Sequence, residues 1–257
     1  MDERFAPPDD SAARAVRTGG MGALLAGVVF LITIAYTFGF LFARGLSMEM
    51  LNVPAQLLPW VHANTVAYVG LWWIFVLHLL LLLPAPAGLA VIAGRDRPMV
   101  RMATTAGVAG AIVGMAAAMV NAATAPALGA ASVSTTPALL PNVRLMSELA
   151  GSLGLHLRLL SDLLVAVWLA VTGWALLRTP GWRAQSVAQL VAAALVLLVV
   201  VEKPFDVLDL EPSLGFVLAL VYLGMGIAML RRVGLRVASQ RQRERIGPDV
   251  NGELPPD

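Results

Sequence analysis

The chain has 257 residues, of which 58% are hydrophobic and 13% are charged. Soluble proteins carry about 25% charged residues, so this composition predicts a membrane protein. The chain has no cysteine, which excludes a disulfide scaffold, thiolate catalysis, zinc–cysteine sites and iron–sulfur ligation. The formal net charge is only +2.

Six segments are long and apolar enough to cross a hydrocarbon core about 30 Å thick. The predicted spans cover residues 21–43, 64–83, 102–123, 157–177, 184–201 and 213–230. Each must be helical, because backbone polar groups cannot stay unpaired in lipid. We therefore predict an all-α, six-helix transmembrane bundle over residues 21–230. A disordered tail (residues 1–20) precedes it and a basic tail (residues 231–257) follows it.

The basic residues predict how the bundle is oriented. The alternate gaps that include both termini hold 14 of the 18 Lys and Arg residues, and the other gaps hold four. Cytoplasmic loops carry the excess of Lys and Arg, so both termini are expected in the cytoplasm. The Arg-rich composition with a single Lys suggests a high-GC bacterium, hence a bacterial cytoplasmic membrane.

Short stretches between the spans predict local structure. Pro84 and Pro86 are expected to kink or end the second span. The loop from Arg44 to Ala63 mixes apolar and polar residues and is expected to lie along the outer interface. The segment from Ala125 to Pro141, rich in Ala, Ser, Thr and Pro, is interpreted as a flexible linker.

Two features predict partners other than the bilayer. Gly107, Gly110 and Gly114 allow close helix approach, either within the chain or to a helix of another protein. The arginines from Arg231 to Arg245 either provide ordinary positive-inside charge or contact anionic lipid. A nucleic-acid partner is not predicted, because no aromatic residues are interleaved with these arginines.

Candidate chemistry precedes and enters the fourth span. If one helix runs from Arg144 to Asp162, Arg144–Glu148 and Arg158–Asp162 are i,i+4 pairs of opposite charge. Asp162 would lie about one turn inside the apolar core, where an ionisable group needs a partner. Either the helix is an amphipathic extension with two structural ion pairs, or Glu148, His156 and Asp162 face an outward-open cavity as proton-transfer or catalytic groups.

The remaining histidines and carboxylates offer weaker candidates. His78, in the second span, either bonds to a neighbouring helix or joins Arg158 and Asp162 in a proton relay. A metal site could draw on residues on the outer side: His62, His156, Glu202 and Asp206. The acidic loop matches no EF-hand spacing and also fits solvated charge. The remaining alternative for His62 and His156 is that they bind a haem between them. No cofactor is predicted.

The order of elements resembles a large bacterial family of small polytopic membrane proteins known only as a domain of unknown function. The resemblance covers residues 14–232 and depends on the stretches ARAVRTGGMGALLAGVVFLI, LRLLSDLLVAVWLAVTGWALL and RTPGWRAQSVAQL. It implies the six-span architecture and transfers neither an activity nor a functional residue.

Three functions follow as hypotheses. The first is a non-catalytic membrane module that packs with a partner or senses the envelope, since the chain lacks HExxH, GxSxG, GxGxxG and Walker motifs. The second is a small-solute or proton transporter that uses His78, Arg158 and Asp162. The third is a membrane-embedded enzyme with a His/carboxylate site, with or without a metal, on the outer face.

Overall fold

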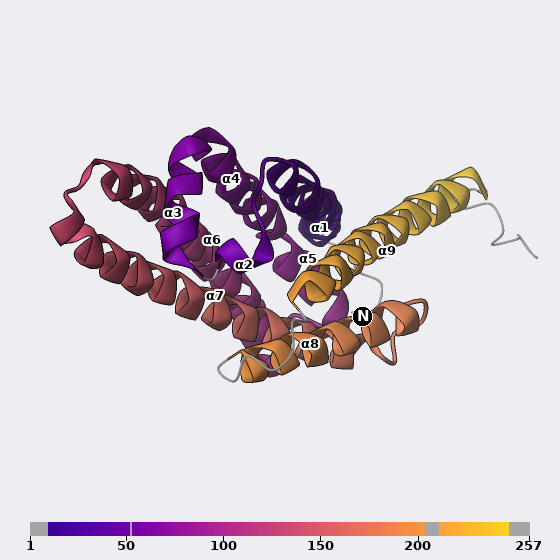
Figure 1. Cartoon of the computed structure of the whole chain (residues 1–257). Coiled ribbons are helices and arrows are strands. Elements are labelled where there is room, and N and C mark those ends of the chain that lie inside the picture. Colours follow the sequence, from indigo (N-terminus) through magenta and orange to yellow (C-terminus); the bar gives the residue numbers. More distant parts are fainter. Residues whose placement is uncertain (1–9, 52, 204–210, 247–257) are drawn as a thin grey trace, which may run out of the picture.

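The computed structural model describes residues 10–51, 53–203 and 211–246, and the regular structure in these ranges is helical, with no strand (Figure 1). The elements are α1 (Asp10–Ala35), the π-helix η2 (Tyr36–Leu41), α2 (Met48–Leu51), α3 (Pro54–Ala63), α4 (Thr65–Leu82), α5 (Ala85–Ala93), α6 (Pro98–Ser134), the 3-10 helix η3 (Pro137–Leu139), α7 (Leu140–Leu176), α8 (Arg183–Glu202) and α9 (Glu211–Ile246).

Six helical segments are long and apolar enough to cross a membrane, and each contains or overlaps one predicted span. They cover residues 11–41, 65–93, 98–134, 137–176, 183–202 and 214–234. The prediction of an all-helical, six-span protein is therefore confirmed at this level, while several of the helices are longer than the predicted spans.

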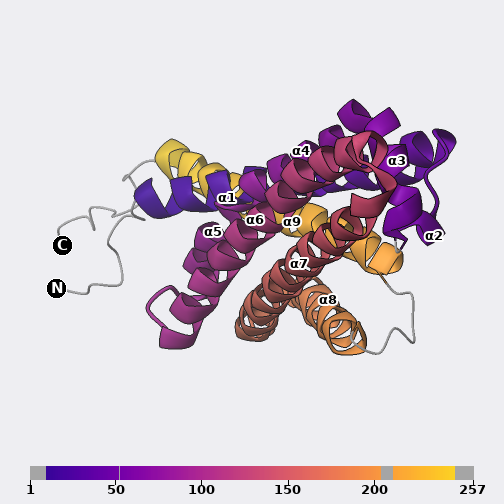
Figure 2. The ribbon, with the colours of Figure 1, turned by 60° about the vertical axis from the view of Figure 1, so that its left-hand side comes forward.

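The helices form a bundle in which neighbours along the chain mostly pack together. α1 lies against α9, α4 and α5, and α7 lies between α6 and α8. Figure 2 shows α2, α3 and the α6–α7 connection at one end of the bundle, and the start of α1 and the end of α9 at the opposite end. This arrangement follows from an even number of spans.

Small residues bring α6 close to its neighbours. A Cβ on Gly107 would lie 2.8 Å from Cγ of Trp168, and one on Gly114 would lie 2.7 Å from Oγ of Ser161. The Ser161 hydroxyl also donates a 2.7 Å hydrogen bond to the Gly110 carbonyl. All three glycines are buried, so they serve contacts within the chain.

The predicted break in the second span is present. α4 ends at Leu82, and α5 begins at Ala85 after Pro84. The last turn before α6 requires Gly94, whose φ of 96° lies in the left-handed region that favours glycine. The two prolines therefore divide one membrane-crossing segment into two helices without ending its path.

Two local expectations were wrong, and one local feature was not expected. α1 begins at Asp10, so residues 10–20 are helical rather than part of a disordered tail. The expected linker is also helical as far as Ser134, because its many alanines favour helix and Pro126 removes only one backbone donor. The first span ends in the π-helix η2, which no sequence signal indicated.

Candidate functional site

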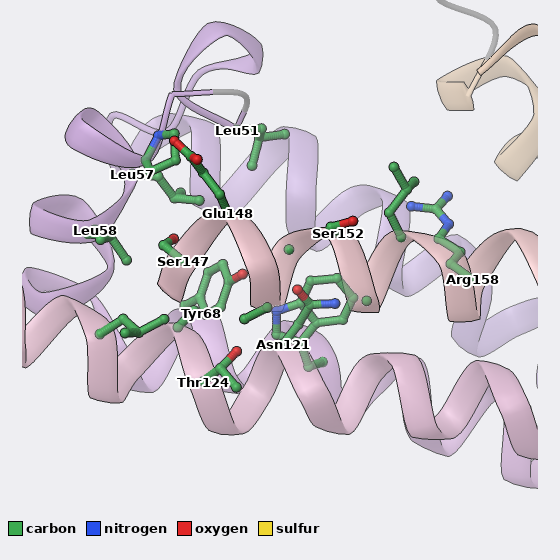
Figure 3. Close-up of a pocket in the computed structure, with 18 of the residues that line it drawn as sticks. Leu51, Leu57, Leu58, Tyr68, Asn121, Thr124, Ser147, Glu148, Ser152 and Arg158 are labelled. Atoms are coloured by element: carbon green, nitrogen blue, oxygen red, sulfur yellow. The ribbon is translucent and has the colours of Figure 1, made fainter. Parts of the chain in front are cut away.

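A pocket of about 870 Å³ lies at the end of the bundle that carries α2 and α3 (Figure 3). It is lined by residues of α2, α3, α4, α6 and α7, and by Lys203 at the end of α8. One wall is apolar and includes Leu51, Leu57 and Leu58. The side formed by α6 and α7 carries polar residues such as Asn121, Thr124 and Ser147 among apolar ones.

The outer segment that forms the apolar wall is fixed by specific contacts. The Trp60 indole N–H donates a 2.9 Å hydrogen bond to the Arg44 carbonyl. α3 approaches α6 so closely that a Cβ on Gly129 would lie 2.9 Å from the Leu58 carbonyl oxygen. The predicted amphipathic outer loop thus folds into short helices that pack on the bundle and close one side of the pocket.

The polar side of the pocket comes from three helices. Tyr68 of α4, Asn121 and Thr124 of α6, and Ser147 and Ser152 of α7 line it (Figure 3). The Asn121 amide and the Thr124 hydroxyl each donate to a carbonyl of their own helix, at 3.0 and 2.7 Å. The side-chain oxygens of Asn121 and Thr124 can still accept a hydrogen bond from a ligand, because an amide or hydroxyl oxygen has free lone pairs.

Tyr68 and Trp72 place two buried polar atoms at the pocket. Their rings meet edge to face, with centroids 6.0 Å apart. Tyr68 is only 5% exposed. The Trp72 indole N–H points toward the Tyr68 oxygen. The geometry does not make a hydrogen bond, so this buried N–H has no partner among the described residues. A buried donor without a partner is costly, so a bound molecule that accepts a hydrogen bond from the Trp72 N–H would be stabilised here.

Charged groups lie along the pocket as well. Glu49, Glu148, Arg158 and Lys203 line it. Because α7 is continuous, Arg158 Nε lies 4.0 Å from Asp162 Oδ2, as the i,i+4 spacing predicted. Among the described residues Arg144 and Glu148 form no ion pair within 4.0 Å, so the second predicted pair is wrong.

The histidines predicted on the outer side do not join this pocket. His156 is exposed, and its Nδ1 lies 2.7 Å from the Ser152 carbonyl oxygen of its own helix. His62 is exposed on α3. Neither lines the pocket that Glu148 and Arg158 share. Of the predicted group of Glu148, His156 and Asp162, only Glu148 lines this pocket.

The metal candidates are not gathered into one site either. Glu202 is 9% exposed at the end of α8, and Asp206 lies outside the described residues. Within the described ranges, no group of three or more His, Asp and Glu side chains could hold a metal ion.

A second polar feature lies inside the bundle, at His78. This residue is 2% exposed, and its Nδ1 lies 2.9 Å from the Ala26 carbonyl oxygen of α1. The expected bond from His78 to a neighbouring helix is thus confirmed. The ring stacks on Phe30, with centroids 4.4 Å apart.

Tyr222 of α9 connects His78 to the fourth span. The His78 and Tyr222 ring centroids are 5.7 Å apart, and the Asp162 carboxylate is close enough to Tyr222 to interact with it electrostatically. The structure thus gives two pairs, Arg158 with Asp162 on α7 and His78 with Tyr222 across α4 and α9, with an electrostatic interaction between Asp162 and Tyr222. Sequence reasoning missed Tyr222; its only signal was a tyrosine inside an apolar span, in a chain with three tyrosines.

No family model, curated protein or solved structure matches this chain. Its function must therefore be argued from the pocket and from these two pairs inside the bundle, since a fold alone does not specify a function.

Proposed function

We propose that this protein is a non-catalytic, multi-pass membrane module that binds a small amphipathic molecule in the pocket at its outer face. The observation that carries the proposal is the joint lining of one 870 Å³ pocket by an apolar wall and by a polar side with buried Tyr68. Binding there would let the module sense a component of the envelope.

The pocket has the character of a small-molecule site. Such sites have volumes of about 300–1,000 Å³, with mostly apolar walls and a few placed polar groups. Leu57 and Leu58 provide apolar contact, while Asn121, Ser147 and the Tyr68 hydroxyl provide hydrogen bonds. This combination favours a ligand with one apolar and one polar part.

The outer location of the pocket depends on the orientation of the chain. With 14 basic residues on one side and four on the other, the positive-inside rule favours both termini in the cytoplasm of a bacterial cell. The pocket lies at the end of the bundle opposite the start of α1, which is then the outer end. The arginines from Arg231 to Arg245 would contact the anionic inner leaflet.

The positions of the ionisable residues favour binding over catalysis. General acid–base catalysis requires both groups within hydrogen-bond reach of one substrate. Glu148 lines the pocket, but His156 and Asp162 do not. The enzyme hypothesis, which combined these residues, therefore has less support than ligand binding.

The test is ligand-dependent stability of the purified protein. Wild-type protein in detergent is heated with each of a panel of short-chain neutral, cationic and anionic amphiphiles. A ligand at 100 times its Kd stabilises the folded state by about 2.7 kcal/mol and raises the Tm. Ser147→Trp should fill the pocket and abolish the shift, whereas Ser134→Trp, at the exposed end of α6, should retain it. A shift that survives Ser147→Trp would contradict the proposed site.

The two pairs, Arg158 with Asp162 and His78 with Tyr222, favour proton transport as a second candidate. Proton relays inside membranes use chains of ionisable groups, and Tyr222 interacts with both His78 and Asp162. Proteoliposomes containing the wild type, Asp162→Asn or Tyr222→Phe would be tested for pH-driven proton flux. Transport is supported if the wild type conducts and both variants lose flux, and it is contradicted if the wild type is no more permeable than empty vesicles.

A further inference from the structure

α7 is much longer than a membrane crossing requires. It has 37 residues, which at 1.5 Å per residue gives about 55 Å, against a hydrocarbon core of about 30 Å. The predicted span begins at residue 157, so Leu140–His156, here called the outer half of α7, extends beyond it. α6 accompanies α7 along its length, and the two run side by side to their connection (Figure 1).

The outer half of α7 carries an exposed apolar stripe. Leu145, Leu149 and Leu153 are 55%, 63% and 54% exposed. At 100° per residue these leucines lie within about 80° of one another around the helix. Water-exposed helices normally place polar residues on such a face.

The stripe continues without a change of direction into the predicted span. Leu160, Leu163 and Val167 are also exposed, and the same 100° spacing places them on the sector that holds the three outer leucines. Within the span, an exposed apolar face contacts lipid. The outer leucines are therefore the continuation of a lipid-facing surface.

The charge distribution around the stripe is also that of a lipid-facing surface. No charged residue stands between Arg101 and Arg144, a range that includes most of α6 and the tip of the hairpin. Arg144 and Glu148 lie about 100° or more away from the centre of the stripe around α7. A hairpin that projected into water would need charge on its outer faces, whereas an interfacial helix needs it only on one side.

We infer that the outer half of α7 lies against the outer leaflet, with Leu145, Leu149 and Leu153 in the boundary between headgroups and acyl chains. The α6–α7 hairpin is then tilted along the membrane rather than standing in water. The occupant of this surface is lipid. This inference rests on the proposed orientation of the chain and does not depend on a ligand in the pocket.

Site-directed spin labelling tests the inference, and the cysteine-free chain allows single labels without other changes. Leu149→Cys and Leu153→Cys are labelled with a nitroxide in vesicles of phosphatidylethanolamine and phosphatidylglycerol. Leu163→Cys, on the same stripe inside the span, is the lipid reference, and exposed Arg144→Cys is the water reference. Collisions with oxygen and with a water-soluble nickel complex are measured for each.

The labels at Leu149 and Leu153 should show more oxygen collisions and fewer nickel collisions than Arg144, with values between those of Arg144 and Leu163, as expected at the boundary between headgroups and acyl chains. Nickel collisions as frequent as at Arg144 would overturn the inference. Dipolar broadening that disappears on dilution with unlabelled protein would also overturn it, because a second copy would then cover the stripe. Leu145→Cys provides a third label should either of the others fail to fold.

Discussion

At the scale of single residues, the bundle depends on positions where a side chain cannot fit. Trp168 is completely buried, and its ring lies where a Cβ on Gly107 would be. Loss of a small residue in this contact should therefore change stability first.

Gly107→Ala tests this contact. The new Cβ would lie 2.8 Å from Cγ of Trp168, and overpacking of a buried contact costs about 1–3 kcal/mol. We expect that loss in the free energy of unfolding, measured by titration with SDS in mixed micelles. Gly151→Ala is the matched control, because a Cβ there meets nothing within 4 Å. It should be neutral or stabilising by up to about 1 kcal/mol through helix propensity. Equal losses in both variants would contradict the packing described for Gly107.

The three histidines, which are candidates for chemistry, lie in different environments. His78 bonds to α1 inside the bundle, whereas His156 and His62 are exposed. A histidine's position in a sequence gives its depth in the membrane but not its neighbours. Only the rotation of each helix about its axis decides that His78 faces Phe30 and Tyr222.

At the scale of elements, the lengths of α6 and α7 differ most from expectation. A hydropathy profile identifies only the most apolar part of a helix. For this reason the sequence predicts a linker at the end of α6, which contains Ser and Thr. The long hairpin provides one side of the pocket, through Asn121 and Thr124 on α6 and Ser147 on α7. Ala125 and Leu128, which lie in the predicted linker, also line the pocket, so a flexible linker there would remove their contribution.

Hydrogen–deuterium exchange tests the helical end of α6. Backbone amides of residues 127–134 should exchange slowly, because each donates within the helix. Amides of Thr136 and Ala138, at the connection to α7, should exchange much faster and serve as the internal reference. Complete exchange of residues 127–134 at the earliest time point would favour the linker.

At the scale of the whole molecule, the net charge of +2 conceals a polarised chain. The segments predicted in the cytoplasm carry 14 basic and nine acidic residues, or +5, and the outer side carries four basic and seven acidic residues, or −3. These two values add to the formal +2. This difference supports the proposed orientation, in which the pocket lies on the outer side.

Thiol labelling tests this orientation in intact cells. Thr136→Cys, exposed in the α6–α7 connection, should react with a membrane-impermeant maleimide. Asp96→Cys, exposed between α5 and α6, should react only after the cells are permeabilised, because positive-inside flanks place it in the cytoplasm. The opposite pattern would invert the topology and move the pocket to the cytoplasmic face.

The sequence by itself determined the class of the protein, the number of its spans and the expected side of its termini. These properties are sums over many residues, so local errors at Ala125–Ser134 or at residues 10–20 did not alter them. The i,i+4 pair of Arg158 and Asp162 was also predictable, because both lie on one helix.

The tertiary structure decided which residues meet. Tyr68, Asn121 and Ser147 come from three helices and share one pocket, and Tyr222 meets His78 across α4 and α9. Such convergence depends on how each helix is rotated and packed against the others, which in turn depends on contacts such as Gly107 with Trp168. A hydropathy profile does not describe contacts between helices. The spans were therefore predictable from the sequence, and the candidate site was not.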